Sequence, residues 1–168
     1  MPSNKPQVSA DPSALGLSHL AQFVGAFVNR QVLSDMQRAG FGDLRESHGY
    51  LVQHLLRGPH SVGQLAKLLG ISQQAVSKTV AELSRAGYLE GVDGEDARVR
   101  LVQLSARGQA SVQAARRSRE RVEARLKKRL GERKARQVHA ALLELLGELG
   151  GLEQVAGRRV PMPDAEEV

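Results

Sequence analysis

Residues 61–104 decide the fold, and they read SVGQLAKLLGISQQAVSKTVAELSRAGYLEGVDGEDARVRLVQL. The opening Ser-x-x-Gln is a capping box, which predicts a short helix that ends at Gly70. Ser72 then predicts the start of a second helix, whose apolar positions recur at three- and four-residue steps as far as Gly87. The segment is therefore expected to form two short helices joined by a tight turn.

The pattern changes after these helices. Residues 88–92 and 97–104 are β-branched or alternating runs, and they flank the turn-rich stretch 93–96. We interpret them as a two-stranded hairpin. In the second run, side chains two residues apart point to the same face of the strand. That face carries arginine at 98 and 100 but apolar residues at 102 and 104, so this strand is expected to leave the core at its arginine end.

Longer amphipathic patterns flank this segment. On the N-terminal side they predict a helix from Pro12 to Gly40, and a capping box at residues 43–46 predicts another that stops at Gly58. On the C-terminal side Ser105 predicts a helix to about residue 130, followed by a last helix that ends at the next pair of glycines. The inward face of the helix after the hairpin is expected to hold Val112, Ala115, Val122 and Leu126.

These elements predict a mainly α fold with one small β-hairpin. We expect residues 43–106 to form one domain around the two short helices and the hairpin, and residues 13–42 and 107–151 to form a helical region beside it. Residues 1–12 are predicted to be a disordered arm and residues 152–168 a C-terminal tail, because both are polar and contain proline.

Composition narrows the function classes. The chain has 168 residues, a formal net charge of +6 and no cysteine, which rules out disulfides, thiolate metal sites and thiol redox sensing. Residues 46–106 carry six basic and six acidic side chains, whereas residues 107–136 carry twelve and three. The basic stretch is either a solvated helix face or an approach surface for DNA. Without a leader or a long apolar run, we expect a cytoplasmic protein with no membrane partner.

The outward face of the second short helix carries side chains suited to reading duplex DNA. Glutamine can pair with adenine, serine and lysine can reach phosphate or guanine, and a hairpin arginine can enter a narrow minor groove. Asp96 either orients the Arg98 guanidinium through a hydrogen bond or only stabilises the turn. The candidate DNA contacts are Ser61, Ser72, Gln73, Gln74, Ser77, Lys78, Arg85, Asp96, Arg98 and Arg100.

The stretch from Gly63 to Gly108 resembles the core of the MarR family of winged helix-turn-helix regulators. The matching pieces are Asp93 at the hairpin tip, Asp96-Ala-Arg98, and the Leu-Ser-Ala-Arg-Gly at residues 104–108, in which serine replaces the commoner threonine. The close resemblance covers about residues 43–108. It implies a homodimer built from both termini, a pseudo-palindromic operator in double-stranded DNA, and transcription regulation, most often repression.

The resemblance implies that residues 43–106 are the DNA-binding domain, called the reading domain below, and that residues 13–42 and 107–151 are the helical dimerisation region. It also implies a small aromatic or anionic effector, bound between the reading domain and the dimerisation helices. Candidates to line that cleft are Phe23, Phe27, His48, Leu51 and Val52, although the two phenylalanines also suit an ordinary core. No histidine spacing supports a metal, and no cofactor or catalytic motif is present, so we expect no enzyme. The alternatives are a winged-helix protein-interaction module, which the neutral charge of residues 46–106 would suit, and a regulator without a ligand response.

Overall fold

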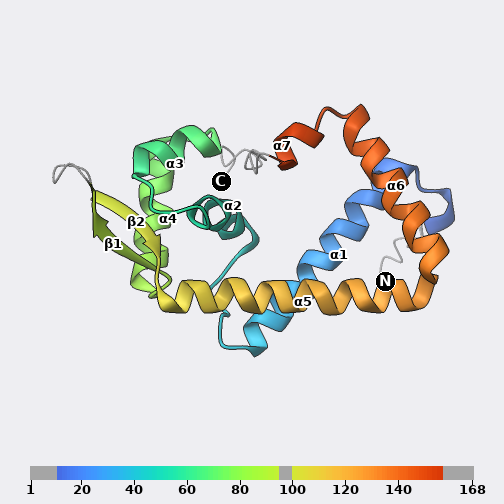
Figure 1. The fold of residues 1–168 in the computed structure, drawn as a ribbon, viewed down its shortest axis with the longest axis horizontal. Helices are drawn as coiled ribbons and strands as arrows, with labels where there is room; N and C mark the ends of the chain where they lie inside the picture. Colours follow the sequence, from blue (N-terminus) through green and yellow to red (C-terminus); the bar gives the residue numbers. More distant parts are fainter. Residues whose placement is uncertain (1–10, 95–99, 157–168) are drawn as a thin grey trace, which may run out of the picture.

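The computed structural model describes residues 11–94 and 100–156 (Figure 1). Within them the chain is mainly helical with one two-stranded antiparallel sheet, which confirms the predicted fold class. Helices α2, α3 and α4 and the hairpin lie together at one end of the long helix α5, and α6 begins at the other end. The predicted arm at residues 1–12 lies almost wholly outside the described residues.

The first helix begins later than predicted. Asp11 accepts a hydrogen bond from the Ser13 backbone N–H (2.9 Å) and caps a 3₁₀ turn, Pro12–Ala14, rather than the long helix. The chain is extended at Leu15 and Gly16, so α1 spans Leu17–Arg38. Gly40 then reverses the chain at a φ of +87°, a conformation that favours glycine.

Helix α2, Glu46–Leu55, has a different cap from the predicted one. Arg45 occupies the N-cap position, and its backbone N–H donates to His48 Nδ1 (3.2 Å). The Asp43 carboxylate instead lies 3.5 Å from the Arg107 guanidinium. The capping box predicted at residues 43–46 is therefore wrong, because a tertiary partner recruits the aspartate.

Helices α3, Val62–Leu69, and α4, Gln73–Arg85, follow the prediction closely. Ser61 Oγ accepts from the Gln64 N–H (3.2 Å), and the Gln64 side chain accepts from the Ser61 N–H (2.8 Å), as a capping box requires. Ser72 Oγ caps α4 through the Ala75 N–H (3.2 Å). The two helices pack on α2 and the sheet around one apolar core, formed by Leu51, Leu55, Leu65, Ala66, Leu69, Val76, Val80, Leu83, Tyr88, Leu89, Val102 and Leu104.

The hairpin pairs β1, Leu89–Asp93, with β2, Arg100–Leu104, so the first strand lies one residue later than predicted. Residues 97–99 of the predicted second strand are outside the described part. Arg100 is exposed while Val102 and Leu104 are buried, which confirms that the strand leaves the core at its arginine end. The backbone of His60 pairs with Val102, which attaches the start of α3 to the sheet.

Helix α5, Ala106–Leu130, connects the two ends of the molecule, and α6, Glu132–Glu148, turns back from it (Figure 1). The buried face of α5 consists of Gly108, Ser111, Ala114, Ser118 and Val122. Of the predicted inward residues only Val122 is fully buried, while Leu126 is exposed. The difference arises because α1 packs against α5, and small side chains allow two helices to approach closely.

A polar network holds α1 on α5. The Asp35 carboxylate of α1 accepts hydrogen bonds from Ser118 Oγ (2.7 Å) and Arg121 Nη2 (2.8 Å) of α5, and from Gln31 and Arg38 of its own helix. These donors, Ser118 foremost, hold the pKa of Asp35 well below its usual range, because each stabilises the charged form. The network fixes the relative position of the two helices.

The C-terminal end differs from the predicted tail, because α7, Leu152–Ala156, is helical. The first and last helices also leave much apolar surface uncovered. On α1 these exposed side chains are Leu17, Leu20, Phe23, Val24 and Phe27. On α5, α6 and α7 they are Leu126, Leu130, Val138, Leu142, Leu143, Leu145, Leu149, Leu152 and Val155.

Candidate nucleic-acid interface and adjoining cavity

One face of α4 is polar and exposed. Gln74, Lys78, Ala81 and Arg85 follow steps of three and four residues, so they form a single stripe along the helix. The opposite face, which contains Val76, Val80 and Leu83, is buried in the core. Because the buried face fixes the rotation of the helix, the stripe points away from the rest of the chain.

The N-terminus of α4 is shaped by its neighbours. Ser77 is exposed beside the stripe, whereas Ser72 uses its hydroxyl oxygen to cap the helix. The Gln73 amide lies against α3, since a Cβ on Gly63 would lie 3.6 Å from its Nε2. Ser61 is half-buried as the N-cap of α3, so its predicted DNA contact competes with a structural hydrogen bond.

Only part of the hairpin tip lies in the described structure. Asp96 and Arg98, both predicted DNA contacts, lie outside the described residues. Arg100 is exposed at the outer end of β2, where it pairs with Asp93. Its guanidinium lies over Gly91 of the neighbouring strand, because a Cβ there would come within 2.9 Å of Arg100 Nε.

Arg107 joins the reading domain to the long helices, a role that sequence reasoning did not assign to it. Its guanidinium stacks 4.7 Å from the centroid of the Tyr88 ring and 5.7 Å from that of Phe41. It also donates to the Gly40 carbonyl (3.1 Å) and to Tyr88 Oη (3.1 Å). The only sequence signal for this residue was its place in the Leu-Ser-Ala-Arg-Gly motif.

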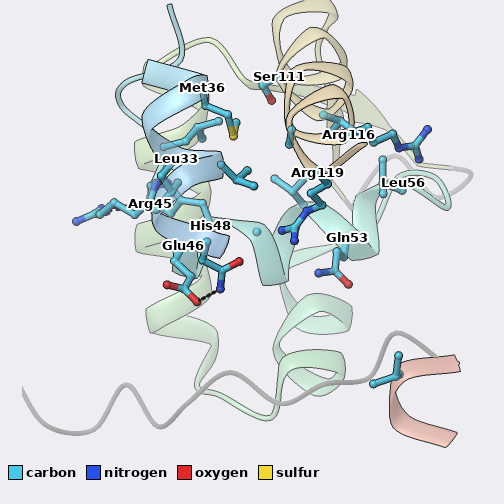
Figure 2. Close-up of a pocket in the computed structure, with 18 residues that line it drawn as sticks. Leu33, Met36, Arg45, Glu46, His48, Gln53, Leu56, Ser111, Arg116 and Arg119 are labelled. Carbon is cyan, nitrogen blue, oxygen red and sulfur yellow. Dashed lines mark hydrogen bonds between the residues drawn. The ribbon is translucent and has the colours of Figure 1, made fainter. Parts of the chain in front are cut away.

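A cavity of about 450 Å³ lies between α1, α2 and α5 (Figure 2). Among the five predicted ligand contacts, His48 and Val52 line it. Phe23 and Phe27 are not in its lining, and Phe27 is 67% exposed on the outer half of α1. Leu51 is 1% exposed and packs in the core of the reading domain. Sequence periodicity placed these three residues on helices correctly but could not assign the faces.

The cavity combines an apolar wall with a few charges. Val32, Leu33 and Met36 come from α1, and Leu56 closes the side formed by α2. Charged and polar side chains complete the lining: Asn29, Arg45, Glu46, Gln53, Ser111, Arg116 and Arg119. In Figure 2 Glu46 is bonded to Asn29, at 2.7 Å between Nδ2 and Oε1. Such a lining suits a small amphipathic molecule, and its excess of arginine favours an anion.

The cavity wall is connected to α4 by an ion pair. Arg45 forms a salt bridge with Glu82 of α4, and His48 Nε2 lies 3.7 Å from the same carboxylate. Burial of His48 lowers its pKa, as does the Arg45 charge, while Glu82 opposes both effects. The hydrogen bond from Arg45 lowers the pKa of Glu82 in turn. Burial and the neighbouring Arg45 charge therefore disfavour the protonated form of His48.

No three His, Asp or Glu side chains of residues 11–94 and 100–156 gather where a metal ion could bind. Over the same residues, no helix is both long and apolar enough to cross a bilayer.

Comparisons with known proteins give one matching family model and many solved structures of similar fold. Residues 43–99 match the model of the MarR family. No curated protein sequence gives a significant match to the chain. Among solved structures, RV1404 from Mycobacterium tuberculosis is similar with a TM-score of 0.69 and 18% identity, over 83% of this chain and 96% of that one.

Two further structures are similar in fold. The apo form of MarR from E. coli has a TM-score of 0.61 and 18% identity, over 79% of this chain and 97% of that one. A variant of MepR from S. aureus, bound to an oligodeoxyribonucleotide, has a TM-score of 0.60 and 19% identity, over 80% of this chain and 99% of that one. The shared fold thus extends beyond residues 43–99 to the long flanking helices.

Proposed function

This chain belongs to the MarR family of DNA-binding transcriptional regulators, which are not enzymes, and we propose that it acts as a homodimeric repressor that dissociates from DNA when it binds a small-molecule ligand. In this proposal the dimer binds a pseudo-palindromic operator in duplex DNA. The observation that carries it is the exposed polar stripe of α4, which stands beside a two-stranded hairpin.

The stripe on α4 supports insertion of this helix into the major groove. Gln74 is near the N-terminal end of the helix, where a recognition helix meets base edges, and its amide can pair with adenine. Lys78 and Arg85 lie one and three turns further along and would contact phosphates. Arg98 and Arg100 of the hairpin would grip the adjacent minor groove, with Asp96 orienting Arg98.

The exposed apolar side chains of α1, α5 and α6 support dimerisation. Leu149 is 82% exposed and Leu142 is half exposed, and both belong to the set of exposed apolar side chains of the terminal helices. Exposed apolar side chains that gather in one region are typical of interaction surfaces. Pairing with a second copy would bury them and place two α4 helices about one turn of DNA apart.

The cavity supports release by a small molecule. It lies between the reading domain and the helices proposed to dimerise, so a ligand there can bias how the two parts are arranged. If the ligand binds the DNA-free arrangement more tightly, it lowers the affinity for DNA by that difference alone. A small aromatic or anionic compound suits the arginines and the apolar wall.

The proposal is tested with the duplex upstream of the protein's own coding region, by fluorescence anisotropy. Gln74→Ala should weaken binding by about 1–3 kcal/mol, mostly through lost base discrimination. Gln113→Ala makes the same change on the exposed surface of α5 and should leave binding unaltered. Affinity should fall steeply with salt, because bound phosphates release counterions.

Two results would refute parts of this proposal. An affinity indifferent to salt and to Gln74→Ala would indicate a protein-interaction module instead of a DNA reader. Equal affinity for a single half-site and for the full operator would argue against the dimer.

A further inference from the structure

The basic side chains of α5 are organised along one side of the helix. Four exposed cations follow steps of four, four and three residues, which places them on a common side: Arg117, Arg121, Arg125 and Lys128. We call these residues the α5 basic face. Neither carboxylate of α5 belongs to it, and one of them, Glu123, pairs with Lys127 elsewhere on the helix, at 3.2 Å.

Most of the charge on this face has no counterpart within the chain. Arg121 is the exception, because its Nη2 lies 2.8 Å from the Asp35 carboxylate of α1. Across residues 11–94 and 100–156, the side chains of Arg117, Arg125 and Lys128 form no ion pair. Like charges that share one side of a helix repel one another, and an anionic partner would remove that repulsion.

The α5 basic face lies far from the surface proposed to read the operator. Helix α5 begins at Ala106, beside the reading domain (Figure 1). At about 1.5 Å per residue, the basic face extends from about 16 Å to about 33 Å along the helix axis from that point. The stripe on α4 points away from the rest of the chain, and a duplex is stiff over about 150 base pairs. The duplex bound by α4 therefore does not bend back to the α5 basic face.

The chemistry of this face suits the phosphates of duplex DNA. Three of its four cations are arginine, whose planar guanidinium can bind phosphate through two parallel hydrogen bonds. Residues 106–148 contain no Phe, Tyr or Trp on which the bases of a single strand could stack. A helix on a membrane would bury its leucines, but Leu126 and Leu130 lie on the opposite side of α5, which the proposed dimer would cover.

We propose that the α5 basic face binds the phosphate backbone of a second duplex, so that a protein held on its operator by α4 captures another segment of DNA. This goes beyond the proposed function and rests on it only for the first duplex. Over the roughly 16 Å from Arg117 to Lys128, a duplex carries about ten phosphate charges, enough for each cation to contact one. Because these contacts are made to the backbone, they read no sequence, and the second segment can be any duplex.

The test measures whether promoter-bound protein captures a duplex of random sequence. The promoter duplex is immobilised at low density on a biosensor surface, protein is loaded onto it, and the random duplex is then injected at several salt concentrations below about 0.1 M. The wild type should capture it, whereas the promoter surface without protein should not. The logarithm of the affinity should fall with the logarithm of the salt concentration with a slope of about −3, because each of the three unpaired cations contributes about −0.9.

Two pairs of substitutions on α5 separate this face from a general charge effect. Arg117→Gln with Lys128→Gln removes two of the three unpaired cations and should reduce the slope to about −1, with promoter loading unchanged. Arg116→Gln with Lys127→Gln removes the same residue types at the same spacing, but about 100° around the helix, and should capture like the wild type. Arg117→Lys with Lys128→Arg keeps both charges and should also capture normally. Circular dichroism establishes that each variant is folded.

Three results would overturn the inference. The first is no capture by promoter-loaded wild type, and the second is an equal loss from both pairs of glutamine substitutions. The third is capture of phosphatidylserine vesicles in place of the duplex, which would indicate a membrane partner. Promoter loading is recorded before the second injection, so failed loading counts against the proposed function and not against this inference. In that case the random duplex is titrated into free protein, where the two glutamine pairs give the same decision.

Discussion

Gly108 offers the sharpest test of how the reading domain is fixed to α5. This residue lies in the first turn of the helix, where a Cβ would come within 2.2 Å of the Tyr88 carbonyl oxygen and 3.2 Å of a Leu104 methyl. The same carbonyl accepts from the Ser105 N–H (3.0 Å), and Ser105 Oγ donates to the Gly87 carbonyl (2.6 Å). A methyl group cannot enter without moving backbone.

Gly108→Ala should therefore destabilise the protein. Overpacking costs about 1–3 kcal/mol and more where backbone must move, while alanine returns up to about 1 kcal/mol of helix propensity. We expect a net loss of about 2 kcal/mol, which lowers Tm by about 4–8 °C for a chain of this size. Thermal unfolding followed by circular dichroism at one protein concentration measures it.

Gly49→Ala is the matched control. Gly49 is also within a helix, α2, but nothing lies within 4 Å of the position of its Cβ. This change should raise the stability by up to about 1 kcal/mol through helix propensity alone. Equal effects of the two substitutions would refute the reasoning, since they differ only in the space around the added methyl.

Three further predictions concern the long helices and their junction with the reading domain. Asp35→Asn should destabilise the protein near neutral pH, and the difference should begin to shrink only below about pH 4: because the folded pKa of Asp35 is lowered, its contribution is fully present above the unfolded value of about 3.9 and is lost as the pH falls from there toward the folded pKa. Urea unfolding at several pH values should show the difference between the two proteins shrinking with acid, and a constant difference would contradict the assignment. Arg107→Met should lower the free energy of unfolding by about 1–2 kcal/mol, through the lost hydrogen bond to Gly40 and the lost stacking on Tyr88, whereas Arg117→Met on the exposed surface of α5 should change it little. Leu142→Glu should shift the sedimentation coefficient toward that of a monomer if this half-exposed residue lies in a dimer interface, and an unchanged oligomeric state would exclude it from one.

Local signals in the sequence predicted most of the secondary structure. The serine caps at Ser61, Ser72 and Ser105 were all correct, because a capping hydroxyl bonds to a backbone N–H only a few residues away. The orientation of β2 was also predictable from the alternation of side chains along a strand, since its two buried residues alternate with residues that are only half-buried. Such contacts need no information about distant segments.

The candidate site was less predictable. The stripe on α4 could be read from periodicity because its opposite face is plainly apolar. The cavity lining could not be predicted from periodicity, since three of the five predicted ligand contacts lie outside it. The arginines that give the cavity its charge include Arg45 and Arg116, and no signal in the sequence distinguished them from the other basic side chains of the protein.

The sequence alone determined which segments are helices, where most of them begin, and which face of the reading helix is polar, because these properties depend on neighbours within about one turn. Only the tertiary structure decided that Arg45 rather than Asp43 occupies the N-cap position of α2, and that it forms a salt bridge with Glu82 of α4. The tertiary structure also decided that the small residues of α5 face α1. Those outcomes depend on groups that the chain brings together from far apart, and their distances follow from the packing of the whole domain.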